Sequence, residues 1–120
     1  MSTEPTPHLW LLRATGVLHR VTESEHRFSA SITVNKSTML AAADELQAAT
    51  RDAMAWVTAN SCPDPNLGDH IARMLSACAE VALSAQRAAT EPFGETDEAM
   101  GRVGDLLALI DFHLRALNHW

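Results

Sequence analysis

Tyrosine is absent from this chain of 120 residues, and lysine occurs only once, as Lys36. Long apolar runs are absent as well, since none approaches the ~18 consecutive residues that a membrane-spanning helix requires. The opening residues, MSTEPTPH, lack the basic region followed by an apolar stretch that marks a secretory signal peptide. The sequence therefore predicts a cytoplasmic protein that makes no membrane contact.

Basic charge and paired cysteines are also scarce. Nine Lys and Arg residues stand against 15 Asp and Glu, which gives a formal net charge of −6. An acidic chain repels the phosphate backbone, and this argues against nucleic-acid binding. A helix between Cys62 and Cys78 would separate them by about 20 Å, far more than the ~7 Å that a disulfide allows. We expect two free thiols, with Cys78 buried on an apolar stripe, and no zinc site.

The residues that are present suit a small globular domain. Hydrophobic side chains make up 47% of the chain and charged ones 20%, a balance typical of folded proteins. This length supports one core without disulfides or metal. Residues 1–7 are polar and contain two prolines, so we expect a flexible tail there and a single helical-bundle domain over residues 8–120.

Four amphipathic helices are indicated by apolar residues that recur at steps of three, four or seven. Three short breaks separate them, each rich in residues that end a helix, such as the two prolines of SCPDPN. The expected starting signals are Thr6–Pro7, Ser37 or Thr38, Asp64–Pro65 or Asn66, and Thr96. The main stripe positions are Trp10, Val21, Phe28, Met39, Leu46, Leu67, Ile71, Cys78, Val81, Val103 and Ile110.

Residues 28–34, FSASITV, fit two structures. Every second residue is apolar, as in a strand, whereas Phe28 and Ile32 also continue the helical stripe of the preceding residues. A lone strand would have no partner in this sequence, and an unpaired strand is unstable. We favour a helix, with Asn35 as a possible C-terminal cap.

Short breaks between long amphipathic helices imply that neighbours run antiparallel. The simplest arrangement is an all-α, up-down-up-down four-helix bundle. Alanine occupies many stripe positions, which predicts close packing of some helix pairs. Gly101 and Gly104 would each cost about 1 kcal/mol relative to alanine inside a helix. Two explanations stay open: a neighbouring helix crosses close to them, or the last helix begins only near Asp105.

The stretch HRVTESEHRF, residues 19–28, contains an E-x-x-H pattern that is typical of metal sites in helical bundles. The candidate ligands are His19, Glu23 and His26. At helical spacing they lie opposite the apolar stripe, whereas ligands of a bundle site point inward. Only one copy of the pattern is present, so we expect a solvated face, no bound metal and no other cofactor.

Two further clusters contain residue types that could act in catalysis. Cys62, Asp69 and His70 form the first, and Asp111, His113 and His119 form the second. The helix start near Cys62 could lower the pKa of its thiol, although a plain loop cysteine is the favoured interpretation. Asp111 and His113 point about 160° apart on a helix and cannot chelate together. No phosphate loop, GxSxG or HExxH motif is present, so an enzyme is the least favoured interpretation.

The last helix carries more apolar surface than one core-facing stripe needs. It is either the most central helix of the bundle or the contact surface for a second copy or another protein. Trp56 lies off the main stripe of its own helix, as an interface aromatic residue would. The interaction surface predicted from the sequence comprises Trp56, Leu106, Leu109, Phe112 and Trp120.

Residues 32–91 resemble the WXG-type small helical-hairpin proteins of actinobacterial type VII secretion. Val34, Met39, Ala42, Ala43 and Leu46 are the positions that look like the opening helix of that family. The W-x-G turn is absent, with CPDP in its place, and Phe112 is followed four residues later by Ala116 rather than by an acid. The high ratio of Arg to Lys also favours a GC-rich genome. The resemblance implies a partner-binding hairpin that is not an enzyme, and it assigns no site residues.

These observations predict a small, non-enzymatic helical bundle that acts through protein–protein contact, as an adaptor, regulator or subunit, and that forms a homodimer. One alternative is a bundle that holds a small ligand or metal in its interior. Methionines suited to lining such a pocket are Met39, Met54, Met74 and Met100, although Met on a stripe usually fills the core. A second alternative is a WXG-type secretion-associated hairpin protein.

Overall fold

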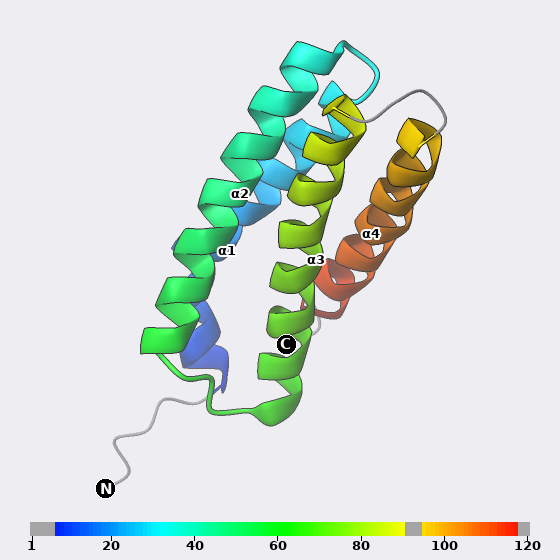
Figure 1. The fold of residues 1–120 in the computed structure, drawn as a ribbon. Coiled ribbons are helices and arrows are strands. Elements are labelled where there is room, and N and C mark those ends of the chain that lie inside the picture. The colour runs from blue at the N-terminus through cyan, green and yellow to red at the C-terminus, as the bar shows by residue number, and fades with distance from the viewer. Residues whose placement is uncertain (1–6, 91–94, 118–120) are drawn as a thin grey trace, which may run out of the picture.

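The computed structural model describes residues 7–90 and 95–117 (Figure 1). Its four helices are α1 (Pro7–Ser31), α2 (Lys36–Ala59), α3 (Pro65–Thr90) and α4 (Glu95–Leu117). They alternate in direction and form the predicted all-α antiparallel bundle, which is elongated, at 61 × 20 × 20 Å. Within the described residues, none of the helices has both the length and the hydropathy that crossing a membrane demands.

The break between α1 and α2 differs from the expectation in its cap. Asn35 is extended (φ −165°, ψ 168°), and its side chain accepts a hydrogen bond from the Thr38 backbone N–H at 2.7 Å. It is therefore the N-cap of α2 and not a C-terminal cap of α1, because the short carboxamide satisfies a free amide of the first turn. α1 itself ends at Ser31, so the strand alternative for residues 28–34 is wrong.

A different cap starts α3. The Asp64 carboxylate accepts hydrogen bonds from the backbone N–H groups of Asn66 (2.8 Å) and Leu67 (3.0 Å). Pro65 then occupies the first helical position, where its missing N–H costs nothing. Of the two predicted starts, Asp64–Pro65 is confirmed. α4 begins at Glu95, two residues before the start at Asp97 that a Thr96 cap implies, so the predicted cap at Thr96 is wrong.

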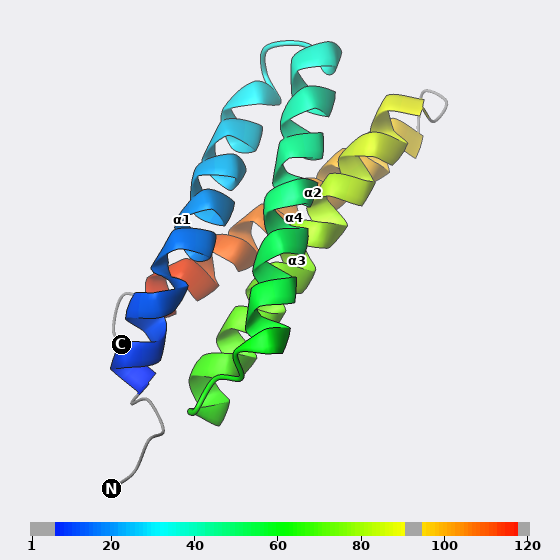
Figure 2. The ribbon, with the colours of Figure 1, turned by 90° about the vertical axis from the view of Figure 1, so that its left-hand side faces the viewer.

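The helices pack in chain order. α2 contacts α1 and α3, while α3 contacts α2 and α4 (Figure 2). α3 is thus a central helix, and the main neighbour of α4 in the described part of the chain is α3 alone. The expectation that α4 could be the most central helix is wrong, because its second flank has no comparable packing partner.

The core contains the predicted stripes. Its largest fully buried side chains are Val21, Phe28, Leu46, Leu67, Ile71, Met74, Leu75, Val81, Val103 and Ile110. Several alanines are also fully buried: Ala43, Ala53, Ala82 and Ala85 have no exposed surface. Small side chains let two helix backbones approach closely, which explains the many alanines on these stripes.

Trp10 connects the first turns of α1 to the end of α2. Its ring is 2% exposed, and its Nε1–H donates to the Asn60 backbone carbonyl at 2.8 Å. Trp56 packs against it with ring centroids 5.5 Å apart and an interplanar angle of 54°. Trp56 lies off its own stripe because it faces α1.

Gly101 and Gly104 lie inside α4, and a Cβ added to either would meet no atom within 4 Å. Both explanations offered for them are wrong, since no helix crosses nearby and α4 begins before them.

Gly104→Ala should therefore raise the free energy of unfolding by about 1 kcal/mol, because alanine loses less backbone entropy in a helix. Urea denaturation measures this. A Gly104→Ala variant that is no more stable than the wild type would contradict the account.

Candidate functional site

The E-x-x-H face of α1 lies in solvent. His19 pairs with Glu23 through an Nε2–Oε1 distance of 3.2 Å, and both side chains are at least half exposed. His26 is likewise exposed and lies 3.5 Å from a Glu25 oxygen. Among the described residues no group of three metal-binding side chains comes together, and these three form a solvated face as expected.

Glu25 is a functional candidate that the sequence pattern did not single out. It is only 7% exposed, although it lies between two exposed members of the same pattern. Burial raises the pKa of its carboxyl; the His26 charge opposes this and the Asp111 charge adds to it. A buried glutamate beside the α4 carboxylate of Asp111 is costly when ionised.

Neither cysteine is activated. Both thiols are free. Burial raises the pKa of Cys62, and its Sγ lies 3.4 Å from the Asp64 carbonyl oxygen. The suggested lowering of the Cys62 pKa by the helix start is therefore wrong. Cys78 has no exposed surface, and burial is the main cause that raises its pKa to about 12. Both are structural thiols at neutral pH.

His70 and His113 meet between α3 and α4. Their Nδ1 atoms lie 3.0 Å apart, and their rings are edge to face with centroids at 5.3 Å. His113 is 3% exposed, and its Nε2 is buried with no hydrogen-bond partner among the described residues. One Nδ1 must donate and the other accept, so in either tautomer Nε2 keeps an unmet hydrogen bond. His70 is thus paired with α4 and not with Cys62.

The other member of the C-terminal cluster that can be placed is Asp111. It is exposed and forms an ion pair with Arg115 at 2.9 Å. Asp111 and His113 point to different sides of α4, as predicted. His119 and Trp120 lie outside the described residues.

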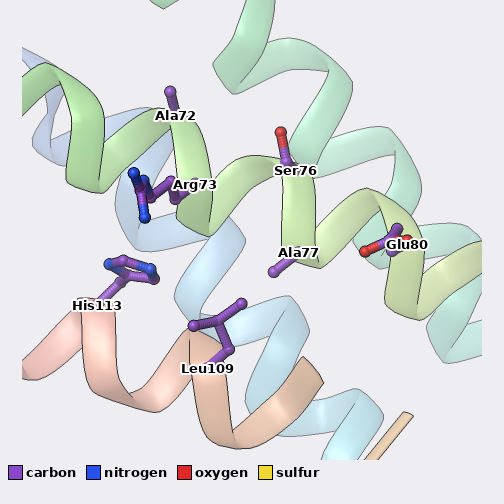
Figure 3. A pocket seen from close by; sticks show the side chains of 7 residues that line it. All are labelled: Ala72, Arg73, Ser76, Ala77, Glu80, Leu109 and His113. Carbon is purple, nitrogen blue, oxygen red and sulfur yellow. The ribbon is translucent and has the colours of Figure 1, made fainter. Parts of the chain in front are cut away.

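A cavity of about 380 Å³ opens along the seam between α3 and α4 (Figure 3). His113 and Arg73 border one end and Glu80 the other, with Ala77 and Leu109 between them. Arg73 pairs with Asp69 at 3.0 Å, and Glu80 pairs with Arg102 across the seam at 2.8 Å. None of its lining residues is a methionine. This cavity is therefore different from the interior, methionine-lined pocket that the sequence suggested as an alternative.

The surface beside this cavity is apolar at its centre and charged at its ends. Phe112 is 60% exposed and Leu109 is 43% exposed. The Phe112 ring lies edge-on to that of His113, with centroids 5.2 Å apart. We call the surface formed by Arg73, Ser76, Glu80, Leu109 and Phe112 the outer α3/α4 face.

Two of the residues predicted for an interaction surface lie elsewhere. Leu106 is 6% exposed and belongs to the core. It lies one turn before Ile110, on the side of α4 that faces the bundle. Trp56 is half-buried against Trp10. Leu109 and Phe112 are exposed on a different side of α4, and the wide apolar arc did not distinguish Leu109 from Leu106.

The buried position of His113 should make stability depend on pH. Burial lowers the pKa of His113, the nearby charges of His70 and Arg73 lower it further, and Asp69 opposes them. Below the ordinary histidine pKa, the unfolded chain binds a proton at this position more readily than the folded chain does. Protonation therefore favours the unfolded chain, and the free energy of unfolding decreases as the pH falls. We expect the free energy of unfolding of the wild type, relative to that of His113→Leu, to decrease as the pH falls from 7.5 through the ordinary histidine pKa of about 6.5. Denaturation of both proteins across this range measures it. A constant difference would contradict the sign, and Glu25 is the same in both proteins.

Comparisons with known proteins assign no family: no protein-family model, curated protein or solved structure matches this chain.

Proposed function

We propose that this protein works by protein–protein contact through the outer α3/α4 face and that its partner is a second copy of the same chain. The supporting observation is the exposed pair of Leu109 and Phe112 on α4, outside the side that fills the core. Full burial of such a side chain contributes ~1.5–3 kcal/mol. In a symmetric dimer each residue contributes twice.

Exposed apolar residues also occur on α1, where Leu12 is 59% exposed. Scattered residues of this kind are common on monomeric proteins. The α4 pair differs because its Leu109 lines a cavity that has charges of both signs at its ends. Leu12 is therefore a suitable control, with similar exposure on a different face.

Sedimentation equilibrium over a concentration series tests the proposal. We expect the wild type to form a dimer and the double variant Leu109→Gln/Phe112→Gln to weaken it by about 100-fold, equivalent to ~2.8 kcal/mol. Leu12→Gln should leave the dimer unchanged. A wild type that stays monomeric at every concentration, or a Leu12→Gln variant that weakens the dimer as strongly, would contradict the proposal. Thermal unfolding of each monomer checks that the fold is retained.

The resemblance of residues 32–91 to WXG-type proteins supports the same class of function. This segment includes α2 and α3, an antiparallel pair of the kind that binds a partner helix. A WXG-type secretion-associated protein is thus a more specific version of the proposal. Co-purification from its host that returns a component of such a secretion system would favour it.

The buried Nε2 of His113 favours a second candidate, binding of a small ligand in the α3/α4 cavity. The cavity volume lies near the lower end of the range for ligand sites, ~300–1,000 Å³. Native mass spectrometry of the purified protein tests this function. Added mass that is lost in His113→Leu would support it, and a bare chain from native cells would count against it.

A further inference from the structure

The charges of the outer α3/α4 face have a regular arrangement along α3. Arg73 and Glu80 are seven residues apart, so they project from one side of the helix about 10.5 Å from each other. Figure 3 places them at opposite ends of the cavity, with Ala77 and Leu109 between them. Leu109 therefore marks the middle of the face, with a positive side chain on one side and a negative one on the other.

A face of this kind can pair with its own copy in two symmetric ways. If the twofold axis crosses both helices near Leu109, each Arg73 lies opposite Glu80 of the second copy. If the axis runs along the helices, Arg73 instead lies opposite the part of α4 that holds His113 in the second copy, where the buried imidazole offers it no opposite charge. Charge complementarity favours the first arrangement.

We infer that two copies pair face to face and antiparallel, with Leu109 on the twofold axis and Arg73 of each copy against Glu80 of the other. This inference rests on the proposed self-association. α3 then lies on α3, and α4 on α4, so that the two seams form a four-helix layer that covers both cavities. Phe112, three residues from Leu109, packs against α4 of the second copy beside its Leu109.

The ion pairs within each copy extend this contact. Asp69 already pairs with Arg73, and Glu80 with Arg102. Each contact between copies therefore joins four charges of alternating sign. Asp69 and Arg73 come from one copy, and Glu80 and Arg102 come from the other. Such a network orders the partners more strongly than an isolated exposed ion pair does.

The side of the bundle that carries this face is large enough for a specific dimer. The bundle is 20 Å wide, and the 23 residues of α4 extend about 34 Å. Full coverage would bury on the order of 1,400 Å² in total, within the range of specific protein–protein interfaces. An apolar centre with a charged rim is also the composition that such interfaces show.

Charge reversal tests the arrangement directly. Arg73→Glu places two carboxylates together at each of the two contacts, and Glu80→Arg places two guanidinium groups together. We expect each variant alone to dimerise about tenfold more weakly than the wild type at low salt. An equimolar mixture should restore wild-type affinity, because both contacts of the mixed dimer are then attractive. The double variant Arg73→Glu/Glu80→Arg should also dimerise as the wild type does.

Native mass spectrometry with sedimentation measures all species. Arg115→Glu is the matched control: it also breaks an exposed i,i+4 ion pair, with Asp111, on the other side of α4, and it should leave the dimer unchanged. If the wild type dimerises but the mixture is no tighter than the single variants, the arrangement is wrong while self-association stands. If the wild type never dimerises, the proposed function itself is wrong.

Discussion

Replacing Trp10 with alanine is expected to lower the free energy of unfolding by about 4 kcal/mol, the usual cost of removing a large buried aromatic side chain. The ring is almost fully buried, packs against Trp56 and donates a hydrogen bond to the Asn60 carbonyl. Its loss would leave a cavity between α1 and α2 and a carbonyl at the end of α2 without its donor. Guanidinium denaturation followed by circular dichroism measures the change.

Two further variants separate these effects. Trp10→Phe keeps most of the apolar contact but removes the donor, so it should cost clearly less than Trp10→Ala. Leu12→Ala, two residues along the same helix, removes an exposed side chain and should change stability by less than about 0.5 kcal/mol. If Trp10→Ala cost no more than Leu12→Ala, the packing of α1 on α2 described above would be wrong.

The second large effect is expected from Ala43→Leu. Ala43 has no exposed surface and lies where α2 contacts its neighbours. Three additional carbons would force the helices apart or drive the new side chain from its preferred rotamers. Overpacking of this kind costs about 1–3 kcal/mol, and thermal unfolding followed by calorimetry measures it.

Ala41→Leu provides a control on the same helix, because Ala41 is exposed. Leucine and alanine have similar helix propensities, so this variant should be nearly neutral. An equal loss of stability in Ala43→Leu and Ala41→Leu would mean that the Ala43 side of α2 does not face the bundle.

The fold was predictable because it depends on local patterns. Phe28, Leu46 and Ile71 recur at helical spacing, and the structure buries all three. Cap identities were less predictable, since Asn35 suits either end of a helix until its side chain is placed. The surroundings of Gly101 could not be predicted either, because the sequence does not distinguish a glycine that faces open space from one beneath a crossing helix.

The candidate site depends on contacts that sequence spacing does not encode. His70 and His113 are 43 residues apart and meet only because α3 and α4 pack antiparallel. Glu25 is buried although Glu23 and His26, close to it in the sequence, are exposed. The apolar arc of α4 did indicate surplus surface. It could not separate buried Leu106 from exposed Leu109, because a wide arc does not reveal which of its edges the neighbouring helix covers.

The central claim is that Leu109 and Phe112 meet a second copy of the chain. The most direct test is an isotope-filtered nuclear Overhauser experiment on an equimolar mixture of labelled and unlabelled protein. The account predicts intermolecular contacts between the Phe112 ring protons and the Leu109 methyl groups, and these should vanish in Leu109→Gln/Phe112→Gln. Intermolecular contacts confined to the first turns of α1, or none at concentrations well above any measured association, would contradict it.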